Sequence, residues 1–207
     1  YAGLHDGTVA YDSDAVRNVF NIWVDMYEKG YFTDPRTNEE IEDFAAGSAG
    51  MYLMGEWVVG SLAASGLATE DVGAFIVPNV NADLPSAVVV EGGPIMVAAS
   101  SIDDADVQTA LRFWVSTEGQ NAWSSGSGNY AGNTNAEAPN AIISKISGDM
   151  SEAGTAAIMR WWEATPSDLQ GELVAELNRF MLDPTAETAE DVMSRMQELN
   201  QDYWDNL

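Results

Sequence analysis

Apolar residues recur at helical spacing near both ends of the chain. Val16, Phe20, Trp23 and Tyr27 are separated by four, three and four positions, which predicts a helix over residues 13–29 with one apolar face. Ser or Thr before such a run and Gly after it are typical helix boundaries. By the same pattern we expect further helices over residues 37–46, 58–66, 101–115, 117–123, 136–146, 153–163 and 167–182, and one that Thr188 caps.

Short apolar runs lie between these predicted helices and have too few residues for another helix. Unbroken apolar runs of this length are typical of strands that are covered on both faces. Such strands are predicted over residues 51–54, 72–77, 87–90 and 94–99. The chain is therefore expected to fold as a helix-rich α/β protein, and the Ser- and Gly-rich residues 124–130 are expected to form a flexible linker.

Gly55 ends the first of these runs and permits a sharp turn into the next helix. Glu56 and Trp57 are thereby placed at the end of a strand and in the first turn of a helix. Ligands bind at this position in open α/β sheets. The pattern therefore predicts a ligand site there, with two plainer alternatives: Trp57 as a core residue, and Glu56 as an acid that stabilises the helix dipole.

Composition narrows the function classes. The 207 residues include 33 acidic and 8 basic side chains, a formal net charge of -25, and no cysteine. Nucleic-acid binding is excluded because it needs clusters of basic residues that neutralise phosphates. The acidity is typical of a solvated surface, and gathering of acids around a cation is the alternative. No apolar stretch approaches the roughly 18 residues needed to span a membrane.

Catalytic motifs are not apparent. His5 is the only histidine, so a histidine-based triad or a multi-histidine metal site is excluded. Neither a P-loop nor a dinucleotide-binding glycine motif is present, and no cofactor is expected. A carboxylate pair for glycoside hydrolysis stays open as an alternative, but 33 acids make such pairs common. We therefore expect no catalytic residues, no metal and no enzymatic activity.

One stretch resembles a known family. Phe44, Gly47, Met51, Gly55 and Trp57 match the pattern F-x-x-G-x-x-x-M-x-x-x-G-x-W, in which the offset of the methionine varies. This pattern is similar to that of the extracellular solute-binding proteins of carbohydrate ABC importers, the family that includes maltose-binding protein. A strand ending at Pro78, a Gly-Gly pair, a helix with F and E-G-Q over residues 105–120, and a closing helix follow in the family's order.

The resemblance implies an architecture of two lobes with a sugar cleft between them, closing by hinge motion. It implies that the chain corresponds to the C-terminal half of such a protein. Residues 1–80 and 128–207 would form the C-terminal lobe of a type II periplasmic-binding-protein-like fold, and residues 88–125 would be an excursion that completes the N-terminal lobe. The apolar residues over 94–115 would then lack a partner, so we expect self-association through them.

The resemblance also implies where a sugar binds, because aromatic faces cover sugar C–H surfaces while polar side chains take the hydroxyls. Trp57 is the first candidate. Adjacent tryptophans on a helix point about 100° apart, so one of Trp161 and Trp162 is expected to face a cleft or partner, with plain packing as the alternative. Gly92 and Gly93 allow close backbone approach, with a hairpin turn as the alternative. The predicted ligand-binding residues are Glu56, Trp57, Gly92, Gly93, Tyr130, Trp161 and Trp162.

These observations predict a substrate-binding component of an ABC sugar importer that captures a mono- or oligosaccharide. The alternatives are a glycan-hydrolysing domain and an acidic helical interaction module. The expected partners are a carbohydrate and the membrane subunits of the transporter. Residues 1–5 resemble no signal peptide, so we expect that any targeting segment is absent from this chain, with an extracellular or periplasmic location and a lipidated N-terminus upstream.

Overall fold

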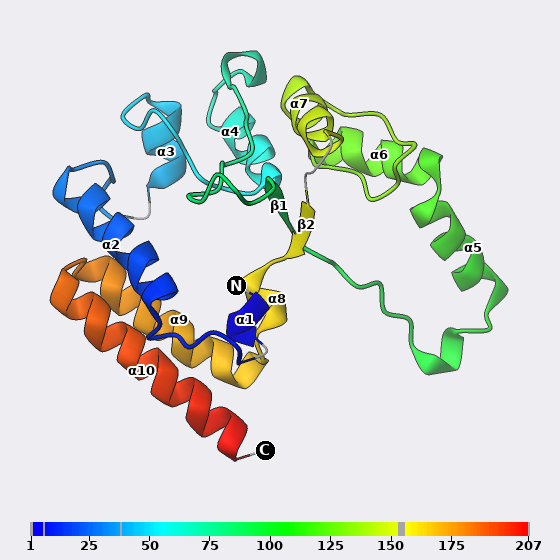
Figure 1. Cartoon of the computed structure of the whole chain (residues 1–207). Helices are drawn as coiled ribbons and strands as arrows, with labels where there is room; N and C mark the ends of the chain where they lie inside the picture. The colour runs from blue at the N-terminus through cyan, green and yellow to red at the C-terminus, as the bar shows by residue number, and fades with distance from the viewer. Residues whose placement is uncertain (1, 6, 38, 153–155, 207) are drawn as a thin grey trace. The chain divides into compact units, whose positions relative to one another are not determined.

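The computed structural model describes residues 2–5, 7–37, 39–152 and 156–206 (Figure 1). The chain divides into two compact units. Unit 1 consists of Tyr1–Glu39 and Met159–Leu207, and unit 2 of Glu40–Ile158. We describe each unit by itself.

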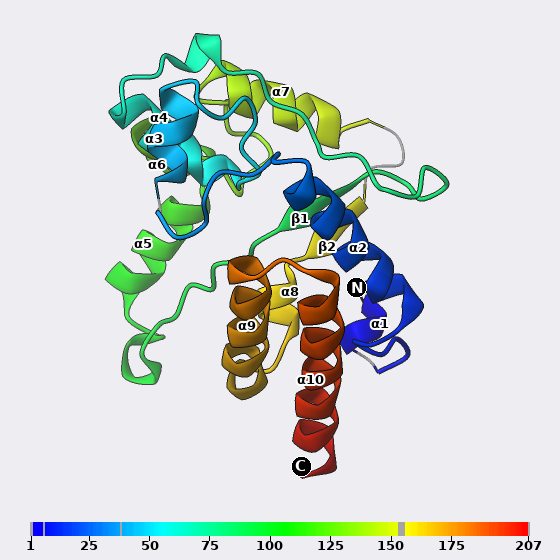
Figure 2. The same ribbon diagram turned by 90° about the vertical axis from the view of Figure 1, so that its left-hand side faces the viewer.

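Unit 1 is helical. α9 (Ser167–Leu182) and α10 (Ala186–Asp205) lie side by side as an antiparallel pair, and α2 (Asp14–Glu28) packs against α10 (Figure 2). The short helices α1 (Ala2–His5) and α8 (Trp161–Ala164) complete the unit. The apolar periodicity therefore predicted the three long helices.

The core of unit 1 comes from the predicted apolar faces. Leu173, Val192 and Met193 are fully enclosed, and Phe20 meets Phe180 edge-on with ring centroids 4.8 Å apart. Such an edge-to-face pair adds to the stabilisation from area burial. The other buried members of this core are Tyr11, Val24, Leu169, Ala189 and Met196.

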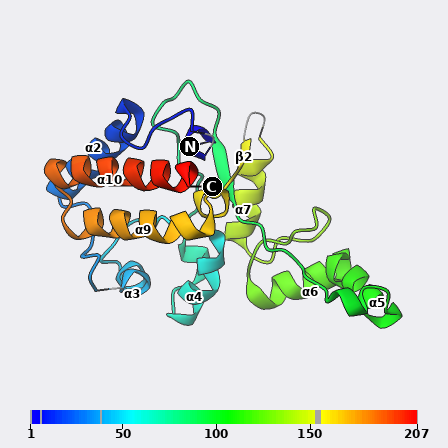
Figure 3. The same cartoon turned by 90° about the horizontal axis from the view of Figure 1, so that it is seen from below.

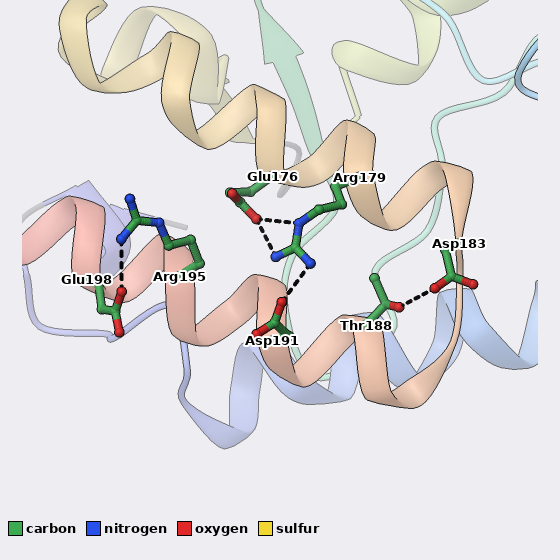
Figure 4. Close-up of polar contacts among 7 residues, drawn as sticks. All are labelled: Glu176, Arg179, Asp183, Thr188, Asp191, Arg195 and Glu198. Atoms are coloured by element: carbon green, nitrogen blue, oxygen red, sulfur yellow. Dashed lines mark hydrogen bonds and ion pairs between the residues drawn. The ribbon is translucent and has the colours of Figure 1, made fainter.

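Charged side chains link α9 to α10 on the surface of unit 1 (Figure 4). Arg179 reaches Glu176 on its own helix and Asp191 on α10, with both nitrogen–oxygen distances at 2.6 Å. Exposed pairs of this kind contribute only about 0–1 kcal/mol each. The apolar core therefore supplies most of the stability of the helix pair.

The turn between α9 and α10 corrects the predicted cap at Thr188. Thr185 is the N-cap of α10, and its hydroxyl accepts a hydrogen bond from the backbone N–H of Thr188. The Thr188 hydroxyl instead donates to Asp183 at 2.6 Å (Figure 4). Threonine is favoured at the N-cap, so the sequence allows either residue, and the prediction of Thr188 was three residues too late.

Unit 2 combines short helices with a two-stranded sheet. In Figures 1 and 3 the strands β1 (Ala87–Val90) and β2 (Ala156–Met159) lie next to each other, and α5 (Ala105–Val115) runs directly into α6 (Thr117–Ser127). The Ala156 N–H donates to the Ser86 carbonyl at 2.8 Å beside the strands. The elements are α3 (Glu40–Ala45), η1 (Glu56–Val58), α4 (Val59–Ala64), η2 (Thr69–Asp71), β1 (Ala87–Val90), η3 (Ala99–Ser101), α5 (Ala105–Val115), α6 (Thr117–Ser127), α7 (Ala141–Met150) and β2 (Ala156–Met159). The predicted helix-rich α/β class is confirmed.

Glycines end helices in both units where the pattern places them. Gly30, Gly47 and Gly66 have φ values of 70°, 77° and 89°, a left-handed conformation that residues with a Cβ rarely adopt. They follow α2, α3 and α4. The predicted ends of these three helices are confirmed.

Three of the four predicted strands are wrong. The residues over 87–90 form β1, but those over 51–54, 72–77 and 94–99 belong to no strand. Met51 is 78% exposed and Met96 is 87% exposed. An apolar run makes a strand only where another segment completes its backbone hydrogen bonds, and a run by itself does not specify that segment.

The bounds of several predicted helices also differ from the structure, and α5 begins at Ala105 after the N-cap Asp104 rather than at residue 101. α7 begins at Ala141 rather than near residue 136, because the Asn140 side chain caps it by accepting from the Ile143 N–H at 2.9 Å. Of the helix predicted over 153–163, residues 153–155 lie outside the described part. The rest of that segment forms β2 and then α8, since β2 pairs with β1.

The apolar residues over 94–115 are largely exposed in unit 2. Ile95, Phe113, Trp114 and Val115 are between 43% and 57% exposed, whereas Val97 and Leu111 are partly buried. Self-association through this surface stays a prediction. Among the described residues, no helix combines the length and apolar composition required to cross a membrane.

Candidate functional site

Trp57 faces outward from η1, the short 3-10 helix directly before α4. Val58, Val59 and Leu62 are all buried and hold η1 and α4 against unit 2. Trp57 lies off their face and leaves 48% of its surface exposed. The alternative of Trp57 as a core residue is not what the structure shows, because core tryptophans are largely enclosed.

Gly55 lets the Trp57 ring approach the backbone closely. A Cβ atom on Gly55 would lie 2.4 Å from Nε1 and 2.7 Å from Cδ1 of the indole. The φ of Gly55 is -70°, a value that any residue adopts, so a side chain at this position would conflict with the indole in its present place and not with the backbone conformation. The indole is therefore seated on the backbone of its own turn, with no side chain between.

The Glu56 carboxyl group, one residue before Trp57, is partly buried. Burial raises its pKa, a hydrogen bond from the backbone N–H of Tyr130 lowers it, and the negative charge of Glu91 raises it. Its Oε2 atom is buried and has no hydrogen-bond partner among the described residues. The structure thus brings together Glu56, Glu91 and Tyr130, which lie far apart in the sequence.

The turn that carries Tyr130 is not the predicted flexible linker. α6 continues to Ser127, and Gly128 ends it with a φ of 76°. The Ser124 hydroxyl donates to the Asn129 carbonyl, and the Asn140 side-chain amide donates to the Gly128 carbonyl at 3.0 Å. Ser124 and Gly128 complete the hydrogen bonding at the C-terminal end of α6. The high serine and glycine content of this segment therefore does not indicate a flexible linker.

A buried glutamine supports the same turn from the other side. The Gly132 N–H donates to Oε1 of Gln120 at 2.8 Å, and the side-chain amide of Gln120 donates to the Trp114 carbonyl at 2.9 Å. Ser127 also approaches α4, since a Cβ on Gly60 would lie 3.3 Å from the Ser127 carbonyl oxygen. These contacts position the Tyr130 backbone against Glu56.

Gly92 and Gly93 lie in an open part of the chain after β1. Neither has a positive φ, and a Cβ on either would meet no atom within 4 Å. The hairpin alternative is wrong because no strand follows at 94–99. The signal that sequence reasoning missed at this point is the side chain of Glu91, an acid placed directly after a strand.

Trp161 and Trp162 belong to unit 1 and face different surroundings. Trp161 packs against the core, and its Nε1 donates to the Tyr11 hydroxyl at 3.2 Å. Trp162 is 49% exposed, with the Arg160 guanidinium 6.0 Å from its ring centroid. The predicted divergence of the two rings is therefore observed, and a ligand role for either stays a prediction.

We expect Glu56→Gln to raise the unfolding temperature near pH 7 by a few degrees, on a scale of about 2–4 °C per kcal/mol for a chain of this size. The pKa of Glu56 is raised above its usual 4.5, so the folded state holds this charge at a penalty once the pH exceeds the raised value. As the pH falls toward 4.5 the carboxyl group is protonated first in the folded state, and the advantage of glutamine disappears.

Thermal unfolding followed by circular dichroism at pH 7 and pH 3.5 checks this expectation. Glu70→Gln is the control, because Glu70 is exposed in the same unit. An equal change in both variants at both pH values would contradict the assignment of a penalty to Glu56.

In residues 2–5, 7–37, 39–152 and 156–206, no three His, Cys, Asp or Glu side chains gather as a metal-binding group. What the turn does present is a half-exposed aromatic face and carboxylate oxygens. These groups suit the binding of a small polar molecule.

Comparison with known proteins supports a binding role. The sequence model of a family described as bacterial extracellular solute-binding protein matches residues 2–147, which is most of the chain. No curated protein and no solved structure gave a match. The match includes Glu56, Trp57 and Tyr130. Proteins of this family are non-enzymatic and bind a solute for transport. The chain therefore belongs to the bacterial extracellular solute-binding proteins.

Proposed function

We propose that this chain is part of the substrate-binding component of an ABC importer and that its solute is a carbohydrate. The observation that carries the proposal is the half-exposed Trp57 indole, which lies close to the backbone of Gly55 and follows Glu56 in the same turn. An aromatic face buries the C–H surface of a sugar ring, and a carboxylate accepts hydrogen bonds from its hydroxyls. The family's role in solute transport supports the importer context.

The resemblance supports a division into lobes. Residues 1–80 and 128–207 would belong to one lobe and residues 88–125 to a second, with hinge closure around the solute. Gly92, Gly93, Tyr130 and the pair Trp161–Trp162 remain proposed contributors to binding. The proposed location is extracellular, with membrane subunits of the transporter as partners and a lipid tether upstream.

Replacing Trp57 by alanine is expected to weaken carbohydrate binding by at least about tenfold, which corresponds to about 1.4 kcal/mol. The loss follows from removal of the aromatic surface that stacks on the sugar. Calorimetric titration of the native protein containing residues 1–207 against a panel of mono- and oligosaccharides measures it. Trp204→Ala is the matched control, since Trp204 is 45% exposed in unit 1 and lies outside the proposed site.

The outcomes separate the parts of the proposal. Equal binding by Trp57→Ala and the unsubstituted protein would remove Trp57 from the site. Absence of binding to every saccharide of the panel would overturn the carbohydrate assignment. An equal loss in Trp204→Ala would show that the effect is not specific to this position.

A further inference from the structure

The segment between η2 and β1 begins with an extended apolar run whose backbone is unpaired. Val72 has extended backbone angles, with φ at -106° and ψ at 120°, and the next element along the chain is β1. Within the described part of the chain, neither the N–H groups nor the carbonyl groups of residues 73–77 have a hydrogen-bond partner. Backbone donors and acceptors are therefore left open along both edges of this run.

Side-chain burial alternates along the same run. Every second residue over 72–76 is partly buried, and the residues between them are exposed, with Phe75 and Val77 each more than half exposed. A period of two is typical of a strand with one covered face. The apolar runs over 51–54 and 94–97 show no such alternation. Residues 72–77 are therefore the run that has the form of a strand and lacks a neighbouring strand.

Both ends of this run are held in place. η2, directly before it, packs against α4 and α7. Directly after it, Pro78 has no backbone N–H, and the side-chain amide of Asn79 donates to the carbonyl groups of Leu84 and Pro85 at 3.4 and 2.5 Å. A partner therefore meets a preformed edge that ends at Val77.

Such an edge fits one kind of occupant. A row of alternating N–H and carbonyl groups is completed by another extended backbone, and the exposed side chains add apolar contact. Natural proteins commonly protect an exposed edge with charged side chains, but residues 72–80 contain none. The edge is therefore open to the addition of a strand.

Charge selects among the polypeptides that could add to this edge. Glu70 and Asp71 lie directly before the run and are exposed, and the chain has a formal net charge of -25. A second copy of the chain would bring the same negative charge, whereas a segment with Lys or Arg at its ends would meet opposite charge. Charge complementarity therefore favours a basic partner over self-association at this edge.

We propose that residues 72–77 are a docking edge for an extended segment of a second, basic polypeptide, which adds to them as a strand. The apolar side chains of that segment lie beside Phe75 and Val77, and its Lys or Arg residues lie near Glu70 and Asp71. This inference is independent of the proposed solute site, because none of these residues is proposed to bind the solute.

Three peptides with blocked ends test the inference. Lys-Val-Thr-Val-Thr-Val-Lys is basic and favours an extended backbone, and Glu-Val-Thr-Val-Thr-Val-Glu is its acidic counterpart. Lys-Val-Pro-Pro-Thr-Val-Lys keeps the basic charge but lacks one backbone N–H on each edge. In calorimetric titrations of the native protein containing residues 1–207, near pH 7, we expect the first peptide to bind at least about tenfold more tightly than either of the others.

Hydrogen exchange locates the docking edge. Bound peptide is expected to slow the exchange of alternate amides within residues 73–77 and to leave residues 51–54 unchanged, because an added strand pairs with one edge of the run.

Variants test the side chains beside the edge. Phe75→Ala removes apolar contact and is expected to weaken the basic peptide by about two- to fivefold. Phe113→Ala is the matched control, since Phe113 is half-exposed in the same unit but outside the run, and it is expected to leave binding unchanged. The double variant Glu70→Gln/Asp71→Asn is expected to reduce the preference for the basic peptide over the acidic one.

Other outcomes would overturn the inference in different ways. Equal binding of the proline-containing peptide would exclude backbone pairing, and equal binding of the acidic peptide would exclude selection by charge. Slowed exchange confined to 51–54 or 94–97 would place the docking edge elsewhere. Concentration-dependent dimerisation that slows exchange over 73–77 would assign the edge to a second copy of the chain. Binding of none of the three peptides would remove residues 72–77 as a docking edge.

Discussion

Leu173→Ala is expected to lower the free energy of unfolding of unit 1 by about 2–5 kcal/mol. Leu173 is completely enclosed between α9 and α10, where it contributes to the core with Val192 and Met193. Truncation removes buried apolar surface and leaves a cavity that a tight helix pair fills only in part. Chemical denaturation followed by circular dichroism measures the change.

Leu182→Ala is the matched control for Leu173. Leu182 lies on the same helix but is 62% exposed, so its replacement is expected to change the free energy of unfolding by no more than about 0.5 kcal/mol. Hydrogen exchange should show faster opening of α2, α9 and α10 in Leu173→Ala. A similar small effect for both variants would mean that Leu173 does not lie in a packed core.

Gly119→Ala is expected to destabilise unit 2 by about 1–3 kcal/mol or more. A Cβ on Gly119 would lie 2.1 Å from the carbonyl oxygen of Phe113, a backbone atom that cannot move aside alone. The same oxygen accepts from the Ser116 hydroxyl at 2.7 Å, and Ser116 caps α6 by accepting from the Gly119 N–H. The added methyl group therefore disrupts the junction of α5 and α6.

Gly126→Ala provides the control on the same helix. A Cβ there meets no atom within 4 Å, and Gly126 has no positive φ, so alanine is expected to stabilise α6 by about 0.5–1 kcal/mol. Thermal and chemical unfolding of both variants gives effects of opposite sign if the close approach is real. Stabilisation by both substitutions would contradict it.

The helices were predictable because their signals are local. The spacing of Leu169, Leu173 and Phe180 along α9 identified the face that is buried in the structure. A glycine after α2 and another after α4 marked the ends. Each of these features depends on residues within one or two turns, which is the range that periodicity and capping describe.

The strands were less predictable because their partners are distant. β1 pairs with β2, which lies about 70 residues later and was predicted as a helix. The residues over 72–77 alternate between partly buried and exposed positions, as in a strand, yet no described segment pairs with them as a ladder. Composition indicates an extended apolar segment, and only long-range hydrogen bonding decides whether it becomes a strand.

The candidate site divides in the same way. The position of Trp57 after Gly55 was predicted from a short stretch, and the structure places the ring half-exposed on that turn. The approach of Glu91 and the Tyr130 backbone to Glu56 was not predicted. These residues lie 35 and 74 positions away, and nothing in their local pattern indicates the contact.

The sequence by itself determined the helix-rich class, the long helices of unit 1, the turn that exposes Trp57 and the resemblance to solute-binding proteins. These depend on local spacing and on the order of short motifs. Tertiary structure decided which apolar runs pair as strands, and it made residues 124–130 the end of a helix and the turn after it. It also decided that the negative charge of Glu91 acts on Glu56 and that Oε2 of Glu56 is buried without a hydrogen-bond donor. The sequence could not predict these features because burial and hydrogen bonding depend on segments that meet only when the chain folds.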